Sequence, residues 1–405
     1  MRKIITSLAI CLVLVACSND DDNNAIPENQ VTKAEVLTNY ANIVYQSYLD
    51  SYNGAVSVQT AVNTFLATKN EVNYNAIKTA WLAAREPYGQ TEAYRFASGP
   101  IDEEGEPWSI ANEGQMNAWP LEEAIIDYVS EDSRVQGAGI FSFNIISDAS
   151  ITIDESSVIS FNEYENNESA VTTGWHAIEF LLWGQDNTNP ADDKPGVRTF
   201  TDYTTEANAD RRGEYLKIAT DLLVKDLNDL VTTWNVGGAY RTVFNDLDEN
   251  TALQQIITGP FTMVGDELSS ERMLAPVKNT GGLNGWGQED EHSCFSDNTH
   301  RDIFTNAQGS YNVIFGKYDT ISGASFYDLV KQANPEQAQI LKNSADEAMA
   351  KVAVIVNNDK PFDYLITKEE ADDTNKGPVL QAVDALMDLG NEISASASAI
   401  GINLN

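Results

Sequence analysis

Two residues near the middle of the chain could form half of a metal site. His176 and Glu179 are three positions apart in the apolar segment 174–184, so on a helix they project from one face. An imidazole and a carboxylate are ligands that Zn²⁺ and iron both accept. The pair could equally be a buried hydrogen bond that only joins two helices, because this spacing is common by chance. The zincin motif His-Glu-x-x-His is absent.

A second group of candidate ligands lies in the polar segment 286–302. Its metal-binding or site-lining candidates are Glu289, Asp290, His292 and His300. We expect Asp297 to be the N-cap of the helix that follows, which would put His300 in the first turn of that helix. The alternative interpretation is a solvated acidic loop with capping residues and no ligand.

A third candidate is a polar stripe in the segment 81–96. Arg85, Tyr88 and Glu92 are spaced by three and four residues, so they share one face of a predicted helix. They could line a site, or they could form an ordinary polar network on a half-exposed helix face.

The elements that must position these residues are predicted to be helices. Apolar residues recur at helical spacing in residues 34–49, 74–96, 210–234, 253–268 and 379–393. Alternation typical of strands is rare, and Thr152–Glu155 resembles a helix start. The predicted fold class is therefore all-α, with two helical-bundle domains at 31–200 and 201–405 separated near the loop 185–203. The two halves could be related by duplication.

The N-terminus has the pattern of a bacterial lipoprotein signal. Residues 1–16 combine a basic start with an apolar run too short to span a bilayer, and small residues lead to Cys17. Residues 17–30 are acidic and rich in Asn, as expected of a flexible tether. We therefore expect export and lipidation of Cys17, with the protein anchored at the outer membrane on its periplasmic side or at the cell surface. The lipid would be its only membrane contact.

The composition excludes several classes of function. The chain has 25 Lys and Arg against 61 Asp and Glu, a formal charge of −36, whereas nucleic-acid binding needs clustered basic residues. Hydrophobic residues make up 42 % of the chain, enough for a folded core. If Cys11 leaves with the signal and Cys17 carries lipid, Cys294 remains alone, which rules out an intrachain disulfide and a cysteine-based zinc site.

Several longer motifs together resemble the imelysin (peptidase M75) family, which includes iron-regulated lipoproteins. The similarity covers Gly174-x-His176-x-x-Glu179 with the Phe-Leu-Leu-Trp-Gly that follows, and also residues 81–96, 99–102, 117–121, 267–273 and 288–297. The resemblance implies two facing helical bundles with the motif segments at their interface. It implies metal ligation by His176 and Glu179, with Glu92, Asp290 and His292 as weaker candidates. The residues implied to line the site are Arg85, Tyr88, Asp102, Trp119, Glu267, Glu289 and His300.

Three functions remain open on this basis. The first is an envelope lipoprotein that binds iron, another divalent metal or a metal chelate, and supports iron uptake together with membrane components. The second is a metallopeptidase that uses the His176–Glu179 pair on zinc, with Glu179 as the catalytic residue. The third is a non-catalytic scaffold that binds a partner and in which the pair is purely structural.

Overall fold

The computed structural model describes residues 30–102, 113–129, 143–279, 287–371 and 374–404. The predicted signal peptide (1–16), Cys17 and all of the predicted tether except Gln30 lie outside the described residues. Residues 31–405 form one compact unit.

Helices dominate the described residues, which confirms the all-α class. The α-helices are α1 (Lys33–Ala67), α2 (Glu71–Thr91), α3 (Glu113–Met116), α4 (Glu155–Ser160), α5 (Gly174–Trp183), α6 (Ala209–Trp234), α7 (Ala239–Asp246), α8 (Glu249–Thr262), α9 (Ala275–Asn279), α10 (Thr299–Phe315), α11 (Phe326–Ala333), α12 (Pro335–Val356), α13 (Phe362–Ile366) and α14 (Pro378–Ala399). Short 3₁₀ turns are η1 (Glu92–Tyr94), η2 (Glu123–Ile125), η3 (Tyr164–Asn166), η4 (Pro190–Asp192), η5 (Phe200–Tyr203) and η7 (Gln288–Asp290), and η6 (Met263–Leu274) is a π-helix.

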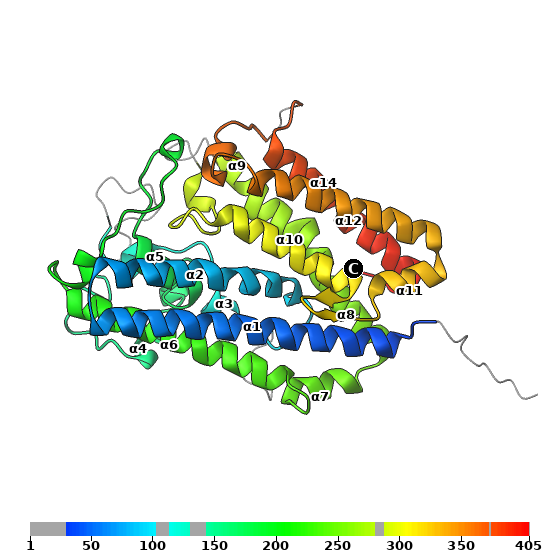
Figure 1. Cartoon of the computed structure of the whole chain (residues 1–405), viewed down its shortest axis with the longest axis horizontal. Coiled ribbons are helices and arrows are strands. Elements are labelled where there is room, and N and C mark those ends of the chain that lie inside the picture. The colour runs from blue at the N-terminus through cyan, green and yellow to red at the C-terminus, as the bar shows by residue number, and fades with distance from the viewer. Residues whose placement is uncertain (1–29, 103–112, 130–142, 280–286, 372–373, 405) are drawn as a thin grey trace, which may run out of the picture. The chain divides into compact units, whose positions relative to one another are not determined.

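One group of helices is built on α1, which packs along α2 and α6, and α6 also contacts α5 (Figure 1). The start of α1 is fixed by a capping box, in which the Thr32 side chain accepts from the backbone N–H of Glu35 and the Glu35 carboxylate binds the cap in return. The helices predicted at 34–49 and 210–234 are confirmed as α1 and α6. The one predicted at 74–96 is confirmed as α2 only as far as Thr91, after which the chain forms the 3₁₀ turn η1. The predicted start at Thr152–Glu155 is confirmed as well, because Asp154 caps α4.

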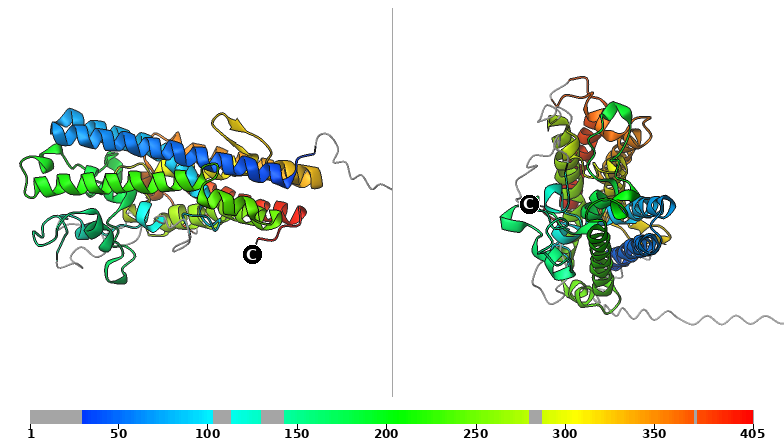
Figure 2. Two further views of the ribbon diagram at one scale, coloured as in Figure 1. Left: turned by 90° about the horizontal axis from the view of Figure 1, so that it is seen from below. Right: turned by 90° about the vertical axis from the view of Figure 1, so that its left-hand side faces the viewer.

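A second group contains α8, η6, α10, α12 and α14, and α12 lies side by side with α14 (Figures 1 and 2). The two groups meet where α2 packs on α10. The approach is close at Gly89, where an added Cβ would lie 2.0 Å from Oγ1 of Thr305, so a larger residue would force the helices apart.

The predicted division at residue 200 has no direct counterpart in this packing. Helix α6 lies beyond the predicted boundary, yet it packs on α1 and α5, which lie before it. The division into bundles at 31–200 and 201–405, and their duplication, therefore stay predictions.

Strand structure among the described residues is limited to one antiparallel pair. Strand β1 (Lys317–Tyr318) pairs with β2 (Ile321–Ser322), with Lys317 opposite Ser322. Among the described helices, none combines the length and apolar composition needed to cross a membrane.

One buried carboxyl in the fold gives a test of stability against pH. Glu122 is 3 % exposed, its Oε1 has no hydrogen-bond partner among the described residues, and burial raises its pKa to about 7. The native state therefore holds an extra proton between the ordinary glutamate pKa and 7, so this group lowers stability as the pH rises through that window. We expect Glu122→Gln to stabilise the protein by roughly 1–3 kcal/mol at pH 8 and not at pH 4.

Urea unfolding at the two pH values measures this difference, and the exposed Glu214→Gln on α6 is the matched control. A Glu122→Gln variant that is no more stable than the wild type at pH 8 would contradict the expectation.

Candidate functional site

The helix that carries the candidate pair is held entirely inside the protein. Every residue of α5 is buried, and its first residue, Gly174, has φ of +79°. A Cβ at Gly174 would lie 2.3 Å from the carbonyl oxygen of Met116. Glycine is therefore required both for the backbone conformation and for the close approach of the segment before the helix.

His176 and Glu179 face each other on α5, as their spacing predicts. Nδ1 of His176 lies 2.9 Å from Oε2 of Glu179, and both side chains are fully buried. The other carboxylate oxygen, Oε1, accepts hydrogen bonds from Oγ of Ser296 at 2.6 Å and from its backbone N–H at 3.0 Å. Both oxygens of Glu179 are thus engaged, whereas Nε2 of His176 is buried and has no partner among the described residues.

A second histidine from a distant part of the chain packs against the first. The rings of His176 and His292 are 4.7 Å apart between centroids, at 77° to one another. Nδ1 of His292 lies 3.0 Å from Oδ2 of Asp302, and its Nε2 lies 3.4 Å from Nδ2 of Asn117. The structure therefore brings together two imidazoles whose Nδ1 atoms are each held by a carboxylate.

Asp302 is the centre of a buried polar network from α2 and α10. It accepts from Nη2 of Arg85 at 2.8 Å and from Oγ of Ser293 at 2.6 Å. Arg85 also donates from Nη1 to the Asn117 side chain at 2.6 Å. This network fixes the positions of Asn117 and His292 beside the candidate pair.

Burial decides the protonation of the two rings. Burial, together with the charges of His292 and Arg85, holds the pKa of His176 well below its usual value. Burial and the charge of Arg272 lower the pKa of His292 to about 4, although its hydrogen bond to Asp302 acts in the opposite direction. Both imidazoles are neutral at pH 7, which is the form that ligates metals. Burial raises the pKa of Glu179 to about 8, against its hydrogen bond from Ser296.

Glu92, one of the weaker ligand candidates, is ion-paired in a neighbouring network. Its Oε2 accepts from Nη2 of Arg272 at 2.7 Å, and from Arg95 at 3.3 Å. Burial alone would raise the pKa of Glu92, but these arginines lower it to about 2. Its Oε1 has no partner among the described residues.

The π-helix η6 supplies the rest of this network. Glu267 and Arg272 are five residues apart, the spacing that a π-helix brings onto one face. Nη2 of Arg272 donates to Oε1 of Glu267 at 2.8 Å. The apolar spacing in 253–268 predicts a helix there, and the structure has two types of helix in succession, α8 and then η6.

A pocket of about 440 Å³ opens beside the two histidines. His292, Asn117 and Trp119 line it, and the Trp119 ring is 4.9 Å from that of His176. Six carboxylates and two guanidinium groups are also on its walls, namely Glu113, Glu163, Glu168, Glu267, Glu271 and Asp290 with Arg95 and Arg272. An excess of negative charge in a concave site attracts cations.

The other predicted site residues have varied positions. Tyr88 is fully buried, and its hydroxyl has no partner among the described residues. Asp290 is on the pocket wall, whereas Glu289 lies near Cys294 and Glu123, because its charge adds to burial in raising the pKa values of both. Tyr88 and Asp290 are therefore close to the network or the pocket, while no contact of the described residues joins Glu289 to His176.

Two predicted residues make local backbone contacts instead. The Asp102 carboxylate accepts from the backbone N–H groups of Phe96, Ala97 and Gly99, so it holds the turn after η1. Nδ1 of His300 lies 3.0 Å from the backbone oxygen of Asp297 in the first turn of α10.

The predicted N-cap of α10 is wrong by one residue. Asn298 occupies the cap, and Asp297 has a left-handed backbone with φ of +58°. The carboxylate of Asp297 is therefore free to join other acidic side chains.

Several residues that build the site were not predicted. They are Ser296, Asp302, Asn117 and Arg272. Each lies within or beside one of the polar segments or motifs identified from the sequence. Their spacing gives no sign that they contact a histidine elsewhere in the chain.

Comparison with known proteins identifies relatives over most of the chain. A family model described as Imelysin matches residues 44–392. Iron-regulated protein A of Synechococcus elongatus is 25 % identical over 354 residues, which cover 84 % of this chain and 80 % of that protein. A solved structure from Parabacteroides distasonis, of a chain named as an iron-regulated protein A precursor, superposes with a TM-score of 0.66. It is 18 % identical, and the match covers 92 % of this chain and 97 % of that one.

Proposed function

The chain belongs to the imelysin family, and on this premise we propose that it is an exported, lipid-anchored protein that binds iron or another divalent metal. The proposed ligand atoms are Nε2 of His176 and Nε2 of His292. In this role the protein would supply metal, or a metal chelate, to iron-uptake components of the envelope. The names of the two relatives, iron-regulated protein A in one organism and an iron-regulated protein A precursor in the other, support a role connected with iron and with export.

The observation that carries the proposal is the unpartnered Nε2 of His176, a buried nitrogen with no hydrogen bond among the described residues. A buried polar atom without a partner costs free energy, so a fold that retains one usually has a use for it. The ring of His292 at 4.7 Å supplies a second nitrogen from another segment. Two neutral imidazoles suit iron, zinc and other first-row metals.

The proposal gives Glu179 an orienting role. Its Oε2 is bound to Nδ1 of His176 and its Oε1 to Ser296, so Glu179 already uses both oxygens. A carboxylate on the far nitrogen of a metal-binding histidine fixes the ring and its tautomer and makes it a stronger ligand. Asp302 has the same relation to His292. Direct ligation by Glu179 remains a prediction from the sequence, and the hydrogen bonds favour orientation.

The pocket provides the route and the remaining ligands. Of the two histidines, His292 lines the pocket, and the ring of His176 packs against two lining residues, His292 and Trp119. Metals in such sites complete their coordination with water, a chelator or a further carboxylate, and Asp290 lies on the same wall. The acidic walls would concentrate cations at the entrance.

A peptidase reading has less support from the geometry. Hydrolysis of a peptide by a zinc enzyme needs a free coordination position on the metal and a general base that reaches the metal-bound water. Glu179 is fully buried and hydrogen-bonded through both oxygens, so a peptide and a water molecule have no direct approach to it. The geometry therefore favours metal binding over peptide cleavage, and a cleavage assay distinguishes the two.

The test is metal analysis of the purified protein after dialysis against Fe²⁺ without oxygen, and in parallel against Zn²⁺. We expect about one equivalent of bound metal and no cleavage of a peptide library. Absence of bound metal above the level of a metal-free blank would refute the proposal. Chelator-sensitive cleavage of peptides would favour the peptidase function.

A further inference from the structure

Three aspartates from distant segments meet close to the loop that carries His292. Asp186 follows α5, Asp297 precedes α10, and Asp363 lies on α13. One carboxylate oxygen from each lies within 4.8 Å of the others. Asp186 and Asp363 are buried, at 4 % and 3 % exposure, so this is not a group of surface acids.

The separations suit a single calcium ion. Calcium binds oxygen at 2.3–2.6 Å, so two oxygens on one ion can lie up to about 5 Å apart. The amide of Gln288 joins the cluster from η7, since its Nε2 donates to Oδ2 of Asp186 at 3.0 Å and to Oδ2 of Asp363 at 3.2 Å. The three carboxylates offer the oxygen ligands that hard cations prefer, and Gln288 holds two of them in place by hydrogen bonds.

An independent observation points to a ligand at this position. Glu291 is 1 % exposed, and its Oε1 is buried without a hydrogen-bond partner among the described residues. Burial raises the pKa of Glu291, and the charges of Asp363, Asp297 and Asp186 raise it further against a hydrogen bond with Thr299, so its carboxyl lies near the cluster. A buried carboxylate oxygen with no donor is a costly feature unless something positive binds it.

The charge of Asp297, Asp363 and Glu291 has no basic partner in the described part of the chain. Among the described parts of the chain, no Lys, Arg or His forms an ion pair with Asp297, Asp363 or Glu291. Burial and the neighbouring carboxylates raise the pKa of Asp297 to about 8 and that of Asp363 to about 7. Such mutual repulsion is what a bound divalent cation relieves.

We propose that Asp186, Asp297 and Asp363 bind a hard divalent cation, calcium in particular, with the buried carboxyl of Glu291 beside the site. This site is distinct from the two histidines, because it is built from oxygen ligands and none of its members is hydrogen-bonded to His176 or His292 among the described residues. The inference does not depend on the proposed function.

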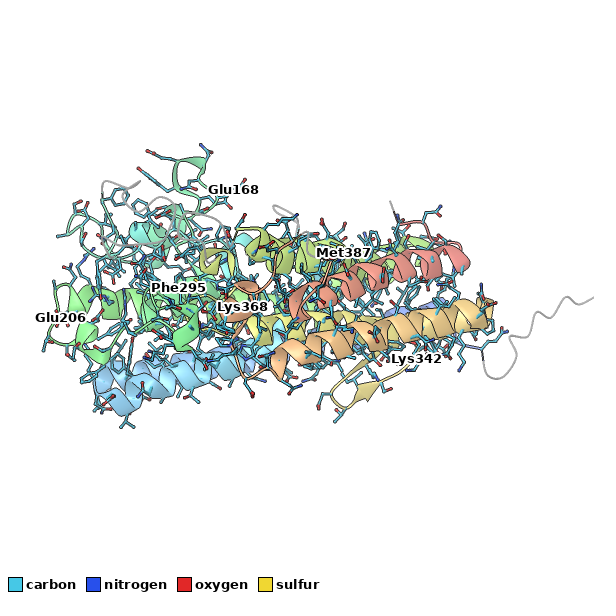
Figure 3. All side chains as sticks on the ribbon, turned by 90° about the horizontal axis from the view of Figure 1, so that it is seen from above. Glu168, Glu206, Phe295, Lys342, Lys368 and Met387 are labelled. Atoms are coloured by element: carbon cyan, nitrogen blue, oxygen red, sulfur yellow. The ribbon has the colours of Figure 1, made fainter. Side chains whose placement is uncertain are left out.

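The cation would also stabilise the loop next to the histidines. Asp297 directly follows Ser296, which donates twice to Glu179. The backbone N–H of Gly196 donates to the backbone oxygen of Phe295 at 2.9 Å. Phe295, labelled in Figure 3, is two residues before Asp297 in the same loop. An ion bridging Asp186, Asp297 and Asp363 would therefore fix this loop to the end of α5 and to α13.

The test is thermal unfolding of protein stripped with EDTA, measured in EDTA and in 10 mM CaCl₂. We expect calcium to raise the melting temperature of the wild type by roughly 3 °C or more. Asp297→Asn should lose this increase, and in EDTA it should melt no lower than the wild type, because it removes one repelling charge. Asparagine also tolerates the left-handed backbone of this position.

Two controls make the result specific. Asp319→Asn makes the same change at another left-handed aspartate, in the exposed turn between β1 and β2, and should keep the full calcium effect. His176→Ala should keep it too, which separates this site from the histidine site. Equal melting temperatures of the wild type in calcium and in EDTA, or an unchanged calcium effect in Asp297→Asn, would overturn the proposal.

Discussion

Replacing His176 with alanine is expected to lower the affinity for Fe²⁺ or Zn²⁺ by at least ~100-fold, because it removes a ligand itself. Loss of a residue that only orients a ligand lowers the metal affinity by roughly 10–100-fold. Loss of the ligand itself should lower it more. His292→Ala should cause a loss of similar size, since the two Nε2 atoms are the proposed ligands. Competition with a chromophoric chelator measures both affinities.

The matched control is His300→Ala. His300 is half-buried, and its one hydrogen bond to a described residue joins Nδ1 to a backbone oxygen, so its loss should leave the affinity unchanged. If Glu179 acts by orienting His176, the metal affinity of Glu179→Gln should lie between those of His176→Ala and His300→Ala, roughly 10–100-fold below the wild type. Equal affinities for the wild type and His176→Ala, with both proteins folded by circular dichroism, would exclude the histidine site.

The sequence predicts the helices well because their cores follow simple periodicity. Helix α6 keeps Leu223, Leu227 and Leu230 on one buried face, and such spacing needs no knowledge of the rest of the protein. The same rule fails to identify η6 as a π-helix, because a π-helix preserves the apolar content of the segment and changes only which residues share a face.

The site is only partly predictable for a related reason. His176 and Glu179 are local neighbours, so their contact follows from helix geometry. The approach of His292 and Ser296 depends on how the loop before α10 folds against α5, which periodicity does not describe. The prediction that Asp297 caps α10 fails because Asp297 adopts a left-handed backbone and the helix begins one residue later, at an Asn298 whose side chain makes no capping hydrogen bond.

Replacing Arg85 with methionine is expected to destabilise the protein by about 3–5 kcal/mol, because it leaves the buried charge of Asp302 without its cation. Arg85 and Asp302 are each 1 % exposed, and Nη2 of Arg85 lies 2.8 Å from Oδ2 of Asp302. Methionine keeps most of the contact with the rings of Trp81 and Trp175, so the loss of packing is small. Urea unfolding at pH 7 measures the change.

The sign of the pH dependence also follows from this pair. Burial would raise the pKa of Asp302, but Arg85 and His292 hold it well below its usual range. A carboxyl with a depressed folded pKa contributes stability above its unfolded pKa and loses it only as the pH falls toward the folded value. The contribution of Asp302 in the wild type should therefore be the same at pH 5 as at pH 8. In Arg85→Met burial favours the neutral carboxyl, so the cost of the substitution should be smaller at pH 5 than at pH 8.

Arg301→Met is the surface control, because Arg301 pairs with Glu86 at 2.6 Å but both side chains are about one-third exposed. We expect it to cost less than about 1 kcal/mol, since water screens an exposed pair. The double variant Arg85→Met/Asp302→Leu should recover part of the loss, because replacing both members of a buried pair by apolar groups removes the stranded charge. If Arg85→Met lowers the free energy of unfolding no more than Arg301→Met does, the charge of Asp302 is still compensated in Arg85→Met. The network around His292 would then have to be held by Asn117, Ser293 and Asn298 alone.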